Sequence, residues 1–181
     1  ELYQPAHALN TAVLALAVSE VLGFTPEDQR QCGIAALLHD VGMARLPAET
    51  LAATKFSSLD RARVRGHPLE GARLLLRQSD VLEAAAVVSY EHHLRQDGNG
   101  YPRLSYPREP FPLSRVVAVC DAFDALLAPR PDRPGMDTLG ALRQIERSAV
   151  AQFDARVVGA FSEVIVSAAA DGRLLLTSRV N

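Results

Sequence analysis

The chain of 181 residues contains only two cysteines, no long apolar run and almost no charge imbalance. Cys32 and Cys120 lie far apart in apolar segments, so we expect buried thiols, not a disulfide framework or a zinc knuckle. The longest apolar run, Ala12–Val18, covers seven residues and is too short to span a membrane, and no signal peptide is evident. A net charge of −2 argues against non-specific binding to nucleic acid or membranes. These absences favour a cytoplasmic protein.

Strand signals are also scarce, and helical periodicity dominates the chain. Apolar residues recur at helical spacing from His7 to Leu22, and Gly23 follows them. Thr25 is expected to cap the next helix, and Ser57 or Ser58 a later one. Further helices are expected near residues 25–40, 57–65, 67–78, 80–93, 114–127, 138–150 and 154–170. The sequence therefore predicts an all-α domain of about seven helices over residues 1–171, followed by a tail or short strand over residues 172–181.

Two loops rich in proline and glycine interrupt this helical pattern. Residues 94–112 form a loop that is long for a compact domain, and such loops are usually functional or disordered. A second loop, after residue 128, carries Arg130 and Arg133 on either side of Pro131. Guanidinium groups suit phosphate oxygens, although arginines are also common on protein surfaces.

The five histidines of the chain can all be assigned to one metal-site pattern. Together with two aspartates they form the set His7, His39, Asp40, His67, His92, His93 and Asp121. Imidazole and carboxylate are ligands for zinc, iron, manganese and nickel. Seven such groups are too many for one ion and suit a pair. A carboxylate such as Asp40 can bridge two metals ~3.5–4 Å apart. The sequence therefore predicts a two-metal hydrolase.

Each of these residues also has a simpler structural interpretation. His39 alone could be a buried polar residue, with Asp40 interacting with the end of its own helix. His67, immediately before a proline, could be an ordinary residue of a helix start. Asp124 lies three residues after the last of the expected ligands, and a structural salt bridge suits it as well as a functional role. The turn before Tyr101 could simply pack that ring inward. The sequence alone leaves these alternatives open.

Taken together, the motifs resemble the HD-GYP family, a branch of the HD-domain metal-dependent phosphohydrolases. The resemblance covers about residues 5–165. The family is all-helical and cleaves cyclic di-GMP, a bacterial second messenger. The motifs stand in the family's order: His7, His39-Asp40-Val41-Gly42, His67-Pro68 with Gly71, His92-His93, Asp97-Gly98-Asn99-Gly100-Tyr101-Pro102, Asp121-Ala122-Phe123-Asp124-Ala125-Leu126, Arg130-Pro131 and Arg133-Pro134.

The resemblance also implies how the metals and the substrate are held. One metal would be bound by His7, His39, Asp40 and Asp121, and Asp40 would bridge to a second metal bound by His67, His92 and His93. Catalysis would rest on His39, Asp40 and Asp121, and substrate contacts on Gly98, Tyr101, Asp124 at the site rim, Arg130 and Arg133. Iron or manganese is the first expectation, with zinc or nickel as alternatives. Some members bind a third ion through a glutamate, but Tyr3 stands at that position, so we expect two.

Three positions depart from the family pattern. Met43 replaces a lysine, Leu94 a glutamate, and Asp132 an aromatic residue. Three functions stay open: hydrolysis of cyclic di-GMP to pGpG or onward to GMP, binding of cyclic di-GMP or a partner protein without useful turnover, and hydrolysis of another nucleotide. By analogy, the partner could be a diguanylate cyclase domain or a second copy of the chain. We also expect a sensor or receiver domain upstream of Glu1.

Overall fold

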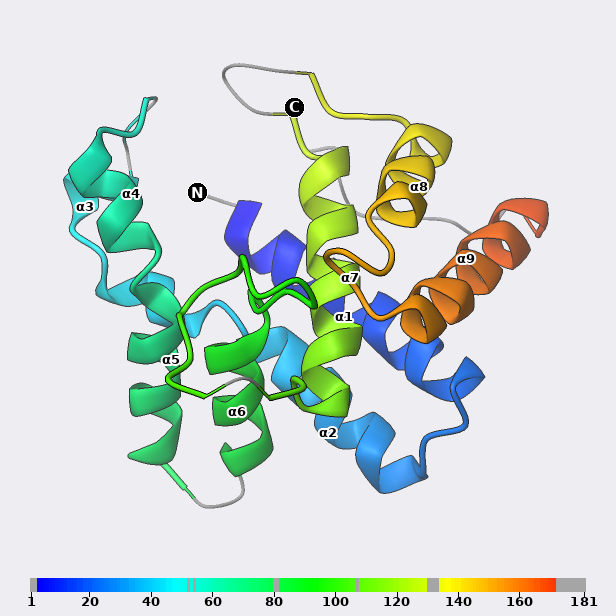
Figure 1. The fold of residues 1–181 in the computed structure, drawn as a ribbon, viewed down its shortest axis with the longest axis horizontal. Coiled ribbons are helices and arrows are strands. Elements are labelled where there is room, and N and C mark those ends of the chain that lie inside the picture. Colours follow the sequence, from blue (N-terminus) through cyan, green and yellow to red (C-terminus); the bar gives the residue numbers. More distant parts are fainter. Residues whose placement is uncertain are drawn as a thin grey trace.

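The computed structural model describes residues 3–51, 53, 55–79, 82–106, 108–129 and 134–171. These residues form nine α-helices and one 3-10 helix, and within them the only β-type pairing is an isolated bridge between Ala149 and Phe153. The predicted all-α class is confirmed (Figure 1). Arg130, Asp132, Arg133 and the expected tail at residues 172–181 lie outside the described residues.

The helices follow the expected order, with two short additions between residues 41 and 51. They are α1 (Tyr3–Val21), α2 (Pro26–Leu38), the 3-10 helix η1 (Val41–Arg45), α3 (Ala48–Leu51), α4 (Ser58–Val64), α5 (His67–Leu76), α6 (Glu83–Glu91), α7 (Pro112–Leu127), α8 (Thr138–Arg147) and α9 (Ala155–Ala170). The stretch after Leu46 was expected to be irregular, but it contains α3, whose four residues are too few to produce a periodic pattern.

Local capping chemistry explains most of the helix starts. The Thr25 hydroxyl accepts a hydrogen bond from the backbone N–H of Asp28 at 3.1 Å. Ser57 and Asp60 form a reciprocal capping box at the start of α4. Thr25 and Ser57 are therefore confirmed as caps. The helix α6 begins at Glu83, later than the expected start near residue 80.

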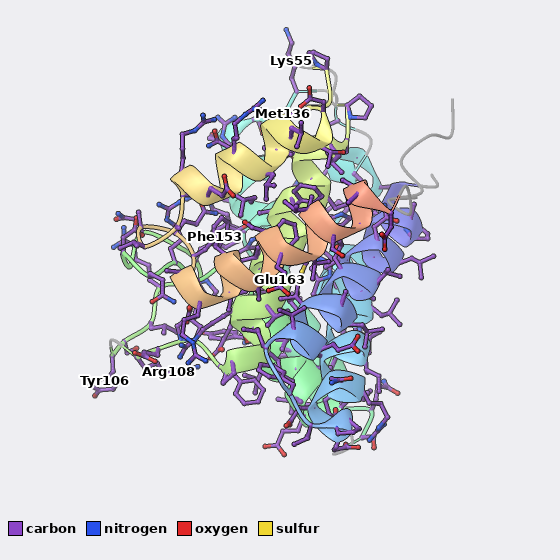
Figure 2. The ribbon with its side chains drawn as sticks, turned by 90° about the vertical axis from the view of Figure 1, so that its right-hand side faces the viewer. Lys55, Tyr106, Arg108, Met136, Phe153 and Glu163 are labelled. Carbon is purple, nitrogen blue, oxygen red and sulfur yellow. The ribbon has the colours of Figure 1, made fainter. Side chains whose placement is uncertain are left out.

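The apolar helix α7 runs through the middle of the molecule (Figure 1). It packs against α1, α2 and α6 as well as α8 and α9. Its residues Val116, Val117, Val119 and Phe123 are fully buried, as expected for a helix that is apolar on nearly all sides. Figure 2 shows Phe153 beside α9, whereas Tyr106 lies at the outer edge of the molecule and is 82% exposed.

The two cysteines are free and buried, which confirms the interpretation of the sequence. Burial raises the pKa of Cys32 to about 12, so this thiol stays protonated at neutral pH. None of the helices that the structure describes is both long and apolar enough to cross a membrane.

Two glycines allow η1 to lie directly against α5. A Cβ atom at Gly42 would overlap the backbone carbonyl oxygen of His67, and a Cβ atom at Gly71 would overlap the Ser89 hydroxyl. The Ser89 hydroxyl in turn donates a 2.8 Å hydrogen bond to the carbonyl oxygen of His39. This close contact places Asp40, just before η1, beside the histidines of α5 and α6.

Candidate metal centre

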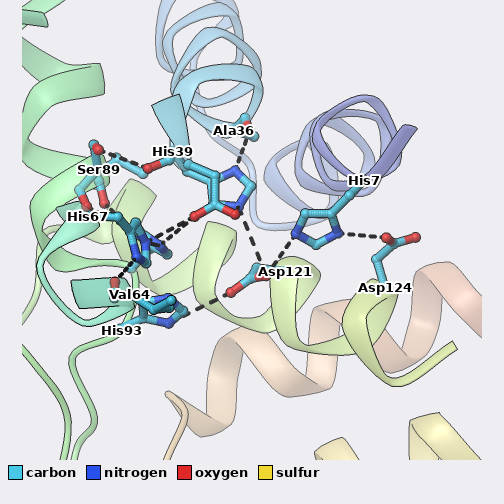
Figure 3. Close-up of polar contacts among 12 residues, drawn as sticks. His7, Ala36, His39, Val64, His67, Ser89, His93, Asp121 and Asp124 are labelled. Carbon is cyan, nitrogen blue, oxygen red and sulfur yellow. Dashed lines mark hydrogen bonds and ion pairs between the residues drawn. The ribbon is translucent and has the colours of Figure 1, made fainter. Parts of the chain in front are cut away.

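Five parts of the chain bring all seven expected ligands together (Figure 3). They are α1 (His7), the end of α2 (His39, Asp40), the start of α5 (His67), the end of α6 (His92, His93) and α7 (Asp121). The residues form two groups, His7–His39–Asp121 and Asp40–His67–His92–His93, and within each group one ligand atom per residue lies within 4.8 Å of the others. The donor set and its spacing fit metal binding.

Asp40 faces both groups through different oxygen atoms. Its Oδ1 atom lies 3.0 Å from His67 Nε2 and 3.5 Å from His92 Nε2. Its Oδ2 atom lies 3.7 Å from His39 Nε2. Burial alone would raise the pKa of Asp40, but the neighbouring histidines outweigh burial and hold the pKa well below its ordinary value. The ionised carboxylate thus has one oxygen available to each group.

Asp121 also reaches toward both groups, which the sequence did not indicate. Its Oδ1 atom lies 3.1 Å from His7 Nε2 and 3.9 Å from His39 Nε2. Its Oδ2 atom lies 3.9 Å from His93 Nδ1. Burial would raise the pKa of Asp121, but the hydrogen bond to His7 and the nearby rings lower it. Two ionised carboxylates therefore lie among five imidazoles.

The backbone fixes which ring nitrogens carry a lone pair. The Nδ1 atoms of His39, His67 and His92 lie 2.7, 2.7 and 2.9 Å from the carbonyl oxygens of Ala36, Val64 and Ser89. Since a carbonyl can only accept, each Nδ1 must donate, and in the neutral ring each Nε2 then presents a lone pair. All three Nε2 atoms face the Asp40 carboxylate. Burial would lower the pKa of His92, but its hydrogen bond to Asp40 raises the pKa, so this ring competes for a proton.

In this cluster the nitrogen and oxygen atoms that can accept a hydrogen bond outnumber the protons available to them. The Nε2 atoms of His67 and His92 lie 3.2 Å apart, and both lie close to Asp40. His39 Nε2 is fully buried and has no hydrogen-bond partner among the residues that the structure describes. Burial also lowers the pKa of His39, which keeps its ring neutral. Buried lone pairs that converge on carboxylates fit divalent cations.

The carboxylate of Asp124 lies behind His7. Its Oδ2 atom is 2.7 Å from His7 Nδ1, and its Oδ1 atom accepts a 2.8 Å hydrogen bond from Asn10. Burial would lower the pKa of His7, but its bonds to Asp121 and Asp124 raise the pKa to about 10. Asp124 is only 3% exposed, so its expected place at the site rim is wrong. Its geometry is that of a carboxylate that orients a metal-binding histidine.

Tyr101 packs against two histidines of the second group. Its ring centroid lies 4.5 Å from that of His93 and 6.4 Å from that of His67. Burial, reinforced by the two aspartates of the centre, raises the pKa of Tyr101, so its hydroxyl stays protonated and can donate. Gly98 lies in the same loop, exposed, at a positive φ of 74° that suits glycine.

Two further residues near the centre were not identified from the sequence. Glu91, directly before His92, is buried, accepts a 2.7 Å hydrogen bond from the backbone N–H of Phe111 and pairs with Arg108. Glu91 thereby connects the long loop to the end of α6, which carries two of the expected ligands. The sequence signal that could have identified Glu91 is an acidic residue inside an apolar helix. The second residue, Arg65, lies over the Tyr101 ring, and no sequence pattern indicated this contact.

Comparison with known proteins agrees with the motifs. A family model described as HD domain matches residues 3–157. The chain is 32% identical over 164 residues to "Cyclic di-GMP phosphodiesterase PA4108" of Pseudomonas aeruginosa. The aligned region covers 90% of this chain and 39% of that protein. It is 29% identical over 166 residues to "3'3'-cGAMP-specific phosphodiesterase 3" of Vibrio cholerae. That alignment covers 90% of this chain and 35% of that protein.

A solved structure shares the fold. Bd1817, described as a HDG"Y"P protein from Bdellovibrio bacteriovorus, superposes with a TM-score of 0.71 at 21% identity, covering 90% of this chain and 52% of that chain. At this identity the likeness concerns the fold alone. The chain spans about two fifths of the length of the curated relatives it matches.

Proposed function

The chain belongs to the HD-domain family, and from that membership we propose that it is a metal-dependent phosphodiesterase that hydrolyses cyclic di-GMP to pGpG or onward to GMP. The observation that carries the proposal is the position of Asp40, whose two oxygens face two different histidine groups. Relatives named as cyclic di-GMP phosphodiesterases support the choice of substrate.

The ligand sets follow from the two groups. We propose that His7, His39, Asp121 and Asp40 Oδ2 hold one ion, and that Asp40 Oδ1, His67, His92 and His93 hold the other. Two divalent ions would supply a nucleophile at neutral pH and neutralise charge on the phosphodiester. Ligand sets rich in imidazole suit iron, manganese, zinc or nickel better than magnesium. Among these, the family resemblance makes iron or manganese the first choice, with zinc or nickel as the alternative.

The protein side chains would bind and orient the substrate. The protonated hydroxyl of Tyr101 would donate to a phosphate oxygen, beside the flexible backbone of Gly98. Arg130 and Arg133 would add positive charge from the second loop. By analogy with the family, a diguanylate cyclase domain would dock on the loop that carries Gly100, Tyr101 and Pro102. We place this activity in the bacterial cytoplasm.

Anaerobic turnover of cyclic di-GMP tests the proposal. Protein reconstituted with Fe(II) or Mn(II) should form pGpG, and Asp40→Ala should abolish both the product and part of the bound metal. Because three relatives are named for 3'3'-cGAMP, the same assay should include that substrate. Faster turnover of 3'3'-cGAMP would change the substrate assignment but keep the reaction class. About two metals per chain without any product would favour a binding module.

Met43→Lys separates an active enzyme from a weakened one. Met43 lies on η1, three residues after Asp40, and is half-buried. Its thioether can neither donate a hydrogen bond nor carry positive charge. A gain of tenfold or more in kcat/KM for Met43→Lys would indicate that the natural site is weakened, whereas an unchanged rate would show that this position is not limiting.

A further inference from the structure

Arg65 occupies an unusual position at the junction of α4 and α5, two residues before the ligand His67. It is the last residue of the α4 turn, and its backbone N–H donates to the carbonyl oxygen of Arg61 at 3.0 Å. The side chain is exposed and its guanidinium lies over the ring of Tyr101, 5.5 Å from the ring centroid. The guanidinium of Arg65 therefore lies next to a ring that contacts two histidines of the candidate metal centre.

The stack continues from Arg65 into the centre. The Tyr101 ring contacts both the guanidinium and His93, whose ring centroid is 4.5 Å from that of Tyr101 at an angle of 35° between the planes. The guanidinium is thus close enough to influence the atoms next to the metal ligands.

The charge of Arg65 is not neutralised by an acid. Its neighbours on α4 and α5 are paired, Arg63 with Asp60 at 3.7 Å and Arg73 with Glu70 at 2.9 Å. No carboxylate in the described ranges pairs with Arg65, which rests on an aromatic face instead. A guanidinium held on a ring keeps its N–H donors free at its edges, and it remains available to an anion.

We propose that Arg65 is a substrate-binding residue that holds a phosphate of the cyclic dinucleotide, with Tyr101 as its platform. This inference rests on the proposed function, because it assumes that the substrate enters over the second histidine group. Arg65 contacts phosphate oxygens through a charge-assisted bond, in both the ground state and the transition state. Its loss should therefore raise KM and leave kcat nearly unchanged.

The test compares Arg65→Gln with Arg61→Gln, a matched control one turn earlier on α4. Arg61 is exposed and its guanidinium donates to the carbonyl oxygen of Phe56, so it does not face the centre. For Arg65→Gln we expect KM for cyclic di-GMP to rise about tenfold or more, with unchanged metal content and Tm. Arg61→Gln should match the wild type. Arg65→Lys should be intermediate, because it keeps the charge but loses the planar fork.

A second experiment tests whether the Tyr101 ring supports Arg65. In a Tyr101→Leu background the aromatic face is gone, and the effect of Arg65→Gln on KM should shrink, which a double-mutant cycle measures. An unchanged KM for Arg65→Gln in active wild-type enzyme would overturn this inference and leave the proposed function intact. If the wild type shows no turnover, the proposed function fails. In that case the affinity for cyclic di-GMP is compared between metal-loaded wild type and metal-loaded Arg65→Gln. Equal affinities, or no binding by either of them, overturn the inference.

Discussion

At the scale of single residues, Asp124 orients the His7 ring. It accepts from His7 Nδ1 at 2.7 Å while Asn10 holds its other oxygen, so the opposite ring nitrogen points at Asp121. We expect Asp124→Asn to lower the metal affinity of the His7 group about 10–100-fold, since such partners tune ligand basicity and orientation. Competition with a chromophoric chelator measures this affinity, and Glu163→Gln on the surface of α9 is the control. Unchanged metal affinity together with a raised KM would instead support a substrate contact.

The same ring makes metal binding depend on pH. In the metal-free protein the pKa of His7 is raised to about 10, so the ring carries a proton at neutral pH that the metal must displace. Between pH 7 and 9 the apparent affinity of this group should therefore rise by about tenfold per pH unit. Chelator-buffered titrations at several pH values give the slope. A flat profile would contradict a protonated His7.

The seven ligands could be predicted from the sequence because adjacent pairs and ordered motifs identify them. Asp124 could not be placed, since spacing along α7 gives the helix face but not how deeply α1 covers it. The contact of Arg65 with Tyr101 could not be predicted either, because the two residues are distant in the sequence. Residue types thus predict chemistry, whereas depth and pairing depend on how the helices pack.

At the scale of elements, the contact between η1 and α5 holds the two ligand groups together. A Cβ atom at Gly42 would meet backbone atoms of His67 and Gly71, which cannot rotate away. We expect Gly42→Ala to destabilise the fold by ~1–3 kcal/mol or more and to weaken metal binding, because η1 and Asp40 must move away from His67. Thermal unfolding and metal content measure both effects.

A matched substitution lies on α9. Gly159 is also helical, but a Cβ atom there would meet nothing within 4 Å. Gly159→Ala should therefore stabilise the protein by about 0.5–1 kcal/mol, since alanine favours the helix and nothing opposes it. If both alanine variants behaved alike, the packing argument for Gly42 would be wrong.

Helix starts were more predictable than helix ends. Thr25 and Ser57 cap α2 and α4 as expected, because capping is a local interaction of a side chain with nearby backbone N–H groups. The helix expected over residues 138–150 instead ends at Arg147, and the chain leaves the helical conformation at Val150, whose φ is +74°. A positive φ at valine is rare, so the sequence did not indicate this end.

At the scale of the whole molecule, the candidate centre lies where several helices meet. Its ligands come from α1, the end of α2, α5, α6 and α7, and they span residues 7–121. Without cations, two ionised carboxylates and several histidine lone pairs lie together in a largely buried space. The periodic pattern indicated the all-α class, but only the packing shows that α7 lies against α1, α2 and α6, whereas α5 packs against α6 and η1.

Metal binding should therefore stabilise the entire domain. An ion present at about 100 times its Kd adds roughly 2.7 kcal/mol to the free energy of unfolding, which corresponds to about 5–10 °C in Tm for a chain of this size. We expect EDTA treatment to lower Tm by about this amount and Mn(II) to restore it. Asp40→Ala should lose most of the shift, because its two oxygens serve both groups. A Tm that does not respond to metal, in protein shown to bind it, would mean that the unfolded chain binds the ion as tightly as the folded protein does.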